Sequence, residues 1–167
     1  VTTVASTEPL TPQMVRIVLE SEALRDFQVG EFTDHYVKLQ LPPPGASYSV
    51  PFDPARVRES MDRDQWHRQR TYTVRSADPE AGTITIDFVT HGSGLAGSWA
   101  AAARPGDLAQ IVGPGGGYSP DPEADCHLLA GDDAAIPAIA VALGRIPAST
   151  PVFVVLEVED EATQRAL

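Results

Sequence analysis

The pattern of apolar residues changes once along this chain, and that change restricts the folds it can adopt. Before about residue 114, short segments alternate apolar and polar side chains, as strands with one solvated face do. These segments lie at 15–20, 36–41, 70–75, 83–89 and 108–112. They predict an antiparallel β domain in which 70–75 and 83–89 form a hairpin. Residues 45–69 read as a long surface excursion with one short helix near 54–61, and 95–103 as a short helix.

A different pattern begins at about residue 124. Continuous apolar runs at 127–130 and 151–158 are typical of strands buried on both faces. The residues between them, 132–146, have helical spacing, so the order predicts a β-α-β unit with parallel strands. We therefore expect a β domain over residues 1–116 and the beginning of an α/β domain over 117–167. So small a unit cannot cover both faces of its sheet, and we expect this second domain to be incomplete.

Charge and composition exclude several classes of function. The formal net charge is −11, from 12 Lys and Arg against 23 Asp and Glu, which argues against a nucleic-acid partner and a polybasic membrane anchor. No apolar run reaches the roughly 18 residues of a membrane span, and the N-terminus lacks a signal-peptide pattern. The single cysteine, Cys126, allows no internal disulfide. These features predict a cytoplasmic protein that is not inserted in a membrane.

The strand at 70–75 has side chains suited to an anionic ligand with a flat ring. Arg70 can grip a phosphate through two parallel hydrogen bonds, and Tyr72 offers a planar face. The hydroxyl of Thr73 can donate to a ring nitrogen. A flavin dinucleotide has these requirements. The alternative is an ordinary edge strand with alternating exposure, and the residues alone favour that alternative.

Residues 91–103 run from a glycine-rich turn into a short helix. The free N–H groups and the positive dipole at a helix start suit a pyrophosphate, and Ser98 could add a hydroxyl. An acidic protein could bind an anion there without a basic surface. The alternative is a simple loop-to-helix connection in which the glycines form the turn. The anion-binding interpretation is weak for this segment alone, and it gains support because the strand with Arg70 and Tyr72 lies one strand earlier.

Residues 131–139 follow a buried strand and open a helix, where α/β sheets bind ligands. They lack the Gly-x-Gly-x-x-Gly and Gly-Lys-Ser/Thr patterns, and two aspartates there repel phosphate. Asp132 could contact a nicotinamide amide or fix the loop, and capping of the helix by Asp132 or Asp133 is at least as good an interpretation. The four histidines have no metal-ligand spacing, so no metal site is predicted.

Taken together, these segments resemble the siderophore-interacting protein family, FAD-dependent ferric-siderophore reductases of the ferredoxin-reductase-like superfamily. The resemblance implies an FAD-binding antiparallel Greek-key β-barrel followed by the start of an NAD(P)H-binding α/β domain. The matching stretches run in family order over nearly the whole chain: 11–19, 32–39, 70–75, 87–92, 94–100, 105–107, 113–118 and 128–139.

The resemblance also implies roles for individual residues. Arg70 would pair with the FAD pyrophosphate, Tyr72 would lie against the isoalloxazine, and Thr73 would hydrogen-bond near its reactive nitrogen. Strand alternation puts Thr73 opposite the other two, so the flavin must cross the strand end or Thr73 must act partly through its backbone. Further cofactor-binding residues are expected at the FAD edge and around its phosphates, at Asp87, Val89, His91, Gly94, Ala96, Gly97 and Ser98.

The function implied is NAD(P)H-dependent, FAD-mediated reduction of a ferric siderophore with release of Fe(II), in association with a siderophore importer. The flavin carries the electrons, so no catalytic side chain is assigned. Three departures matter: Ala134 stands where the family often has Thr or Ser, the loop between His91 and Trp99 is about one residue shorter than expected, and the family continues well past Leu167. Full activity of this chain alone is therefore not expected. The alternatives are another flavin reductase or electron-transfer oxidoreductase, and a non-catalytic binding module associated with siderophore import.

Overall fold

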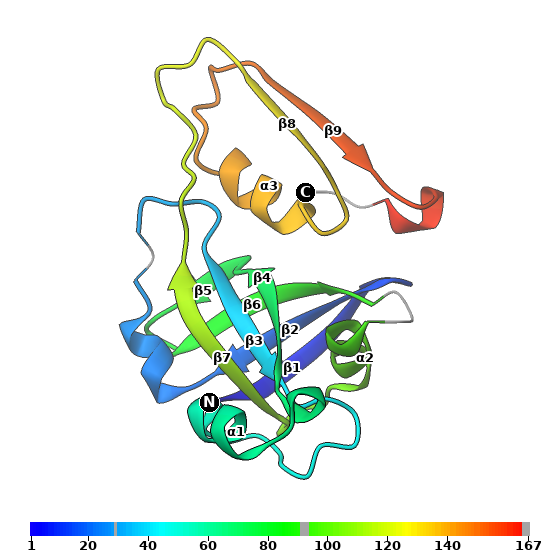
Figure 1. Ribbon diagram of the computed structural model, residues 1–167. Helices are drawn as coiled ribbons and strands as arrows, with labels where there is room; N and C mark the ends of the chain where they lie inside the picture. Colours follow the sequence, from blue (N-terminus) through cyan, green and yellow to red (C-terminus); the bar gives the residue numbers. More distant parts are fainter. Residues whose placement is uncertain (29, 91–93, 165–167) are drawn as a thin grey trace.

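A computed structural model describes residues 1–28, 30–90 and 94–164 of the chain. Its larger part is a twisted sheet, and a small α/β part lies above it in Figure 1. The sheet contains β1 (Thr2–Thr11), β2 (Met14–Glu20), β3 (Tyr36–Leu41), β4 (Arg68–Thr73), β5 (Ser76–Asp78), β6 (Thr83–Val89) and β7 (Leu108–Gly115). The α/β part contains β8 (His127–Asp132), α3 (Ile136–Leu143) and β9 (Val152–Glu157). Three short 3-10 helices lie at Glu22–Asp26, Arg63–Gln65 and Glu161–Thr163.

The sheet has the strand order β4-β3-β7-β1-β2-β6-β5, and its strand pairs are antiparallel. This is the barrel-like arrangement expected for the N-terminal part, with one correction: the hydrogen-bonded ladder does not close. The strands β4 and β5 are left as the two edges. Strand β4 nevertheless lies against β6 without pairing to it. The open side of the sheet is therefore a seam between β4 and β6.

The predicted hairpin between residues 70–75 and 83–89 is wrong. Strand β4 pairs with β3, where Tyr36 faces Thr73, and β6 pairs with β2 and with the short strand β5. The chain crosses between the two sides of the seam at Val74 and Arg75, whose N–H groups donate to His35 O at 2.7 Å and Thr85 O at 2.8 Å. Both segments alternate with the period of a strand, and that pattern does not name the partner.

Strand β1 has no counterpart in the prediction. Its sequence contains Pro9 beside Glu8, which interrupts the alternation and removes a backbone donor. The structure accommodates this segment with register shifts against β2, between Val4 and Ser6 and between Pro9 and Thr11. Such bulges let a strand continue where its local sequence disfavours regular pairing.

The core lies between the inner face of the sheet and α2 (Leu95–Ala102), the helix predicted at 95–103. Small residues Ala96 and Ala100 let this helix approach the sheet, and both are buried. The ring of Trp99 packs edge-to-face on Phe88 at 5.6 Å between centroids. The largest fully buried side chains include Ile17, Leu19, Leu39, Ile84, Ile86 and Phe88.

The long excursion after β3 contains the predicted short helix, α1 (Pro54–Ser60). Asp53 caps it, because its Oδ1 accepts hydrogen bonds from Ala55 N at 2.9 Å and Arg56 N at 3.3 Å. Pro54 occupies the first turn, where its missing N–H costs no helical hydrogen bond. Local capping chemistry therefore explains why an otherwise unpatterned segment turns helical here.

In the α/β part, β8 and β9 form the predicted parallel pair, with His127 opposite Val152. The helix between them is shorter than the predicted 132–146. Asp132 Oδ1 accepts from Ala134 N at 3.0 Å and Ala135 N at 3.2 Å, which holds residues 132–135 in a turn before α3 begins.

The prediction that both strands are buried on two faces is wrong. Leu128, Phe153 and Val155 are 69%, 62% and 60% exposed, because α3 covers only one face of a two-stranded sheet. Across the ranges 1–28, 30–90 and 94–164, every helix is too short or too polar to span a bilayer.

Candidate functional site

A cavity of about 280 Å³ opens at the seam between β4 and β6, beneath the start of α3. Its volume is near the lower end of the range for small-molecule pockets, roughly 300–1,000 Å³. Two strands and the turn before α3 provide its walls, so both parts of the molecule contribute. The lining residues are Arg70, Thr71, Tyr72, Thr73, Asp87, Val89, Ala134 and Pro137.

Strand β4 lines this cavity with residues from both of its faces. Arg70 and Tyr72 alternate with Thr71 and Thr73 along the strand, yet all four border the cavity. The reason is that β4 is an edge strand: among the described strands it pairs with β3 alone. A cavity that extends around a free edge can contact both faces of the strand. Thr73 can therefore reach the same cavity as Arg70 and Tyr72, although it lies on the opposite face.

Tyr72 is a rigid wall of the cavity. Its ring packs against Phe88 with 4.3 Å between centroids, and the side chain belongs to the outer layer of the sheet core. Burial raises the pKa of the Tyr72 hydroxyl, and the nearby charge of Arg70 offsets part of that rise. The phenol is therefore neutral at physiological pH, and the ring offers a fixed flat surface at the cavity.

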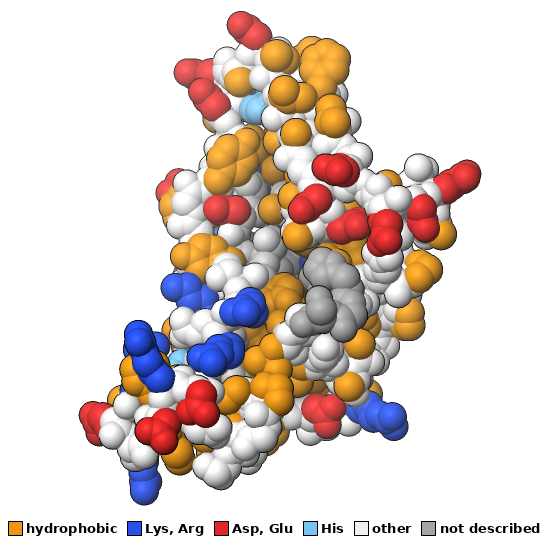
Figure 2. Space-filling view, turned by 45° about the vertical axis from the view of Figure 1, so that its right-hand side comes forward, with side chains coloured by type: hydrophobic (Ala, Val, Ile, Leu, Met, Phe, Trp, Pro, Cys, Tyr) orange, Lys and Arg blue, Asp and Glu red, His pale blue; other side chains and the backbone are white. Residues whose placement is uncertain are grey.

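Arg70 lies in the most cationic segment of an acidic protein. Residues 56–75 contain six of the twelve Lys and Arg residues, at Arg56, Arg58, Arg63, Arg68, Arg70 and Arg75. Within the described ranges, the two ion pairs, Arg16–Asp87 and Arg25–Glu22, involve none of them. In Figure 2 the visible cationic side chains lie over the lower part of the molecule, with some acidic side chains among them, whereas the upper part shows acidic ones. The exposed Arg70 guanidinium donates to Gln69 O at 2.8 Å and is free to bind an anion as well.

Asp87 is an acidic wall whose charge is compensated from behind. Arg16 lies directly opposite it on β2 and binds it at two points, Nε to Oδ1 at 2.7 Å and Nη2 to Oδ2 at 3.0 Å. The Asp87 side chain is 0% exposed, and its hydrogen bond raises the pKa of Arg16 despite the desolvation of the guanidinium. The pair leaves little net charge to repel an anionic ligand. Arg16 was not predicted from the sequence, because the pattern of a single strand does not show which residue of the neighbouring strand lies opposite it.

The other predicted phosphate-binding segment lies outside the cavity. Gly94 and Ser98 are exposed at the first turn of α2, whereas Ala96 and Gly97 are buried against the core. No side chain of the described residues caps this helix end. Phe88 connects the segment to the cavity, since it contacts both Trp99 of α2 and Tyr72. The predicted residue His91 lies outside the described residues.

Asp132 borders a different hollow, with Ala130, Gly131, Val155 and Glu157. Its carboxylate accepts the two backbone hydrogen bonds that shape the turn before α3, which matches the loop-fixing interpretation. The same turn places Ala134 in the cavity, and α3 adds Pro137. Pro137 was not singled out from the sequence, although it follows the aspartates in the same segment.

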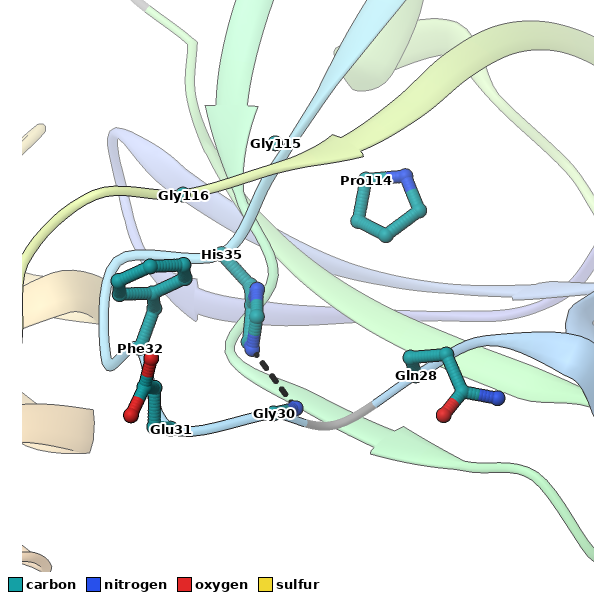
Figure 3. A pocket seen from close by; sticks show the side chains of 8 residues that line it. All are labelled: Gln28, Gly30, Glu31, Phe32, His35, Pro114, Gly115 and Gly116. Carbon is teal, nitrogen blue, oxygen red and sulfur yellow. Dashed lines mark hydrogen bonds between the residues drawn. The ribbon is translucent and has the colours of Figure 1, made fainter.

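A larger hollow, of about 610 Å³, lies at the end of β7 (Figure 3). It is bordered by the loop before β3 and by the end of β7, and His35 accepts a hydrogen bond there from Gly30 N at 3.2 Å. Its lining contains the acidic residue Glu31 and no Lys or Arg. That chemistry does not suit a dinucleotide phosphate, so the smaller cavity is the better candidate site. In the part of the chain that the structure describes, no three His, Cys, Asp or Glu side chains gather as a metal site requires.

Two family models match the chain and together cover most of it. Residues 3–118 match the siderophore-interacting FAD-binding domain. Residues 124–167 match the siderophore-interacting protein model. The junction between the two matches falls in the segment that connects β7 to β8.

Individual relatives agree with these matches. The protein Rv2895c of Mycobacterium tuberculosis is 43% identical over 155 residues, which are 86% of this chain and 52% of that protein. Ferric vibriobactin reductase ViuB of Vibrio cholerae is 43% identical over 95 residues, 54% of this chain and 34% of ViuB. A siderophore utilization protein from T. fusca superposes with a TM-score of 0.80 at 34% identity, over 99% of this chain and 63% of that one. The chain thus spans about half the length of the first of these relatives.

The chain is also similar to part of an importer and to a ferredoxin NADP+ reductase. The mycobactin import ATP-binding/permease protein IrtA of Mycolicibacterium smegmatis is 35% identical over 162 residues, 95% of this chain and 17% of IrtA. A ferredoxin NADP+ reductase from Neisseria gonorrhoeae, solved with FAD and NADP, superposes with a TM-score of 0.66 at 15% identity over 96% of this chain and 58% of that one. At that identity the likeness shows the fold alone, which is ferredoxin-reductase-like.

Proposed function

The chain belongs to the siderophore-interacting protein family, and on that premise we propose that it is the flavin-binding portion of an NAD(P)H-dependent ferric-siderophore reductase. The flavin-binding domain would occupy residues 1–116, and residues 117–167 would begin the nicotinamide-binding domain. The proposal places the protein in the cytoplasm. When bound, FAD would accept a hydride from the nicotinamide and pass single electrons to two successive Fe(III) chelates, releasing Fe(II).

The observation that supports this most is the seam cavity. It combines a guanidinium without a carboxylate partner among the described residues, a neutral aromatic face and threonine hydroxyls. FAD requires a cation for its pyrophosphate, a flat surface for its ring and hydrogen-bonding groups at the ring edge. The residues present therefore fit the group: Arg70 would hold phosphate, Tyr72 would support the isoalloxazine, and Thr73 would hydrogen-bond near its reactive nitrogen.

Further residues would complete the binding of FAD. Asp87 and Val89, which line the cavity, would border the ring edge with His91. Gly94, Ala96, Gly97 and Ser98 would surround the phosphates through the first turn of α2, where the helix dipole favours an anion. Asp132 is proposed to act on the nicotinamide side only through the turn that it shapes.

A ferric siderophore would be the electron acceptor, and the importer is the proposed partner. The similarity to ViuB, named as a ferric vibriobactin reductase, supports the first of these. The similarity to IrtA, named as a mycobactin importer, supports the second. In this proposal Fe(II) leaves because it fits hard oxygen ligands less well than Fe(III) does.

The first test is flavin binding by Arg70→Ala. Loss of a charge-assisted bidentate contact, worth about 1.5–3 kcal/mol, should weaken FAD affinity about 10- to 100-fold in a fluorescence titration. Arg68→Ala is the matched control, because Arg68 is two residues away on the same face of β4 and does not line the cavity. Equal affinity of Arg70→Ala and the unmodified chain would refute the phosphate assignment.

The second test addresses electron transfer. The full-length protein, loaded with FAD, should release Fe(II) from a ferric siderophore when NADH or NADPH is added, as measured with a ferrous-specific chromogenic chelator. Stoichiometric FAD without any Fe(II) release would leave a flavin-binding module and refute the reductase. Reduction of other acceptors only would favour a different flavin reductase.

A further inference from the structure

The loop before β3 binds the segment that connects the two parts of the molecule. Oδ1 of Asp34 accepts hydrogen bonds from Gly117 N and Tyr118 N, both at 2.9 Å. The neighbouring Thr33 donates its backbone N–H to Tyr118 O at 2.8 Å. We call these contacts the linker clamp. They hold the chain at the point where it leaves β7 for the α/β part.

The connecting segment lies close against the clamp loop. A Cβ atom added to Gly115 would lie 2.4 Å from the ring of Tyr36, and one added to Gly116 would lie 3.1 Å from Cβ of Phe32. Figure 3 shows Gly115 and Gly116 passing beside Phe32 and His35. A side chain at either position would require Tyr36 or the Phe32 and His35 side chains to shift, so the chain leaves the sheet close against this loop.

The same loop also contacts the far end of α3. Arg145, just after the helix, donates to Gly30 O at 3.4 Å. The loop therefore contacts the α/β part both where the connection begins and after α3 ends. Ala134 and Pro137, which form one wall of the seam cavity, belong to the element between these two contacts.

The carboxylate of Asp34 is suited to this task. Its partial burial tends to raise its pKa, but the backbone hydrogen bonds from Gly117, Tyr118 and Asp34 itself, together with the nearby His35, outweigh burial and lower it. Asp34 is thus ionised at neutral pH, and its two hydrogen bonds are charge-assisted, which makes them stronger than neutral ones.

We propose that Asp34 is a positioning residue for the flavin cavity: by fixing residues 117–118 it sets the distance between the wall of Tyr72 and the wall of Ala134 and Pro137. Asp34 does not line that cavity, so its influence acts through the linker clamp. The flavin part of this inference rests on the proposed function, whereas the geometric part does not.

The experiment measures cavity geometry and flavin affinity separately. Cys126 is the single cysteine and is exposed, directly before β8, and Ser6→Cys adds a second exposed label site on β1. Pulsed electron paramagnetic resonance between nitroxides at these sites reports the distance between the two parts without FAD. We expect one narrow distribution, which Asp34→Ala broadens, and about a tenfold loss of FAD affinity in that variant.

Two variants separate positioning from general damage. Asp121→Ala removes the same kind of cap in the same connecting segment, where Asp121 accepts from Glu123 N at 2.9 Å and contacts no part of the sheet through that bond; it should change neither readout. Asp34→Asn keeps an acceptor oxygen and should recover most of both. Circular dichroism melting confirms that each variant is folded.

Three results would overturn the proposal. The first is a narrow distribution in Asp34→Ala, whatever its affinity for FAD, since the clamp would then not set the geometry. The second is equal broadening by Asp121→Ala, and the third is broadening without loss of affinity. If the unmodified chain does not bind FAD at all, the proposed function fails, and the distance measurement still decides whether the clamp acts.

Discussion

The two parts of this molecule bury similar side chains to very different extents. The sheet part contains a core in which Ile17, Leu19 and Phe88 are each 0% exposed. The α/β part has a small cluster around Leu129 and Ile139, and its other strand face carries exposed Leu128 and Phe153. Composition does not explain the contrast, since both parts are rich in Val, Ile and Leu. What differs is whether a second layer covers the strand.

This contrast gives the seam cavity two unlike walls. The wall from β4 and β6 is backed by the main core, through the packing of Tyr72 on Phe88. The wall from α3 is backed by the small cluster of the α/β part. In our proposal, a ligand in the seam rests on a firmly packed surface on one side, and the linker clamp sets the placement of the other.

The largest effect is expected from a matched pair of phenylalanine substitutions. Phe88→Ala removes a fully buried ring that contacts Tyr72 and Trp99, and it should lower the free energy of unfolding by about 3–5 kcal/mol. Phe153→Ala removes a ring that is 62% exposed on β9, and its effect should be within about 0.5 kcal/mol. Urea denaturation followed by far-UV circular dichroism measures both.

The same pair tests whether the exposed face is exposed in solution. If Phe153→Ala costs as much as Phe88→Ala, another surface covers β9 and the contrast between the two parts disappears. An unchanged m-value in each variant is the control, since it shows that the two denatured states remain comparable.

Sequence pattern predicted the elements better than their partners. The strands at 36–41 and 83–89 and the helix at 54–61 could be found because alternation, Asp53 and Pro54 act locally. Pairing of β4 with β3 rather than β6 could not be found, because the alternation of Arg70 to Thr73 fits either neighbour. The turn made by Asp132 shortened α3 through hydrogen bonds that only a folded loop shows.

The candidate site divides in the same way. Arg70, Tyr72 and Thr73 were named from one segment, but their chemistry alone favoured an ordinary edge strand, and the family resemblance was needed to assign them to a flavin. Arg16 and Pro137 were not named from the sequence. Arg16 binds the cavity residue Asp87 from a neighbouring strand, and Pro137 lines the cavity from α3, so both depend on how distant segments pack together. The apolar runs at β8 and β9 were misread because covering layers, not the runs themselves, determine burial.

A smaller effect is expected from the two ion pairs. Asp87→Asn weakens a pair whose carboxylate is 0% exposed, whereas Glu22→Gln weakens one whose carboxylate is 88% exposed. The first should cost about 1–3 kcal/mol, a range reduced because Arg16 remains 31% exposed. The second should cost less than about 0.5 kcal/mol.

Thermal melts at low and high salt measure this difference between the pairs. The double variant Arg16→Gln/Asp87→Asn should lose less than the sum of its single variants, because the two side chains interact directly. Additive losses would show that the contact between Arg16 and Asp87 contributes nothing of its own, and would remove the argument that the cavity wall is neutralised.

The smallest effect is expected within the sheet part, at the excursion between β3 and β4. His67 is buried beside the ring of Phe52, 5.4 Å between centroids, and its pKa is lowered from 6.5 by burial and by the charge of Arg58. The unfolded chain binds a proton at His67 more readily than the folded one. Stability should therefore fall as pH drops below about 6.5 and continue to fall until the lowered pKa is passed. His67→Phe keeps an aromatic ring and should remove this part of the pH dependence. The measurement is the melting temperature of each protein, the unmodified chain and the variant, at several pH values from 7.5 to 5. Identical pH profiles would mean that His67 titrates alike in both states, and that the excursion is as loosely packed as the open face of the α/β part.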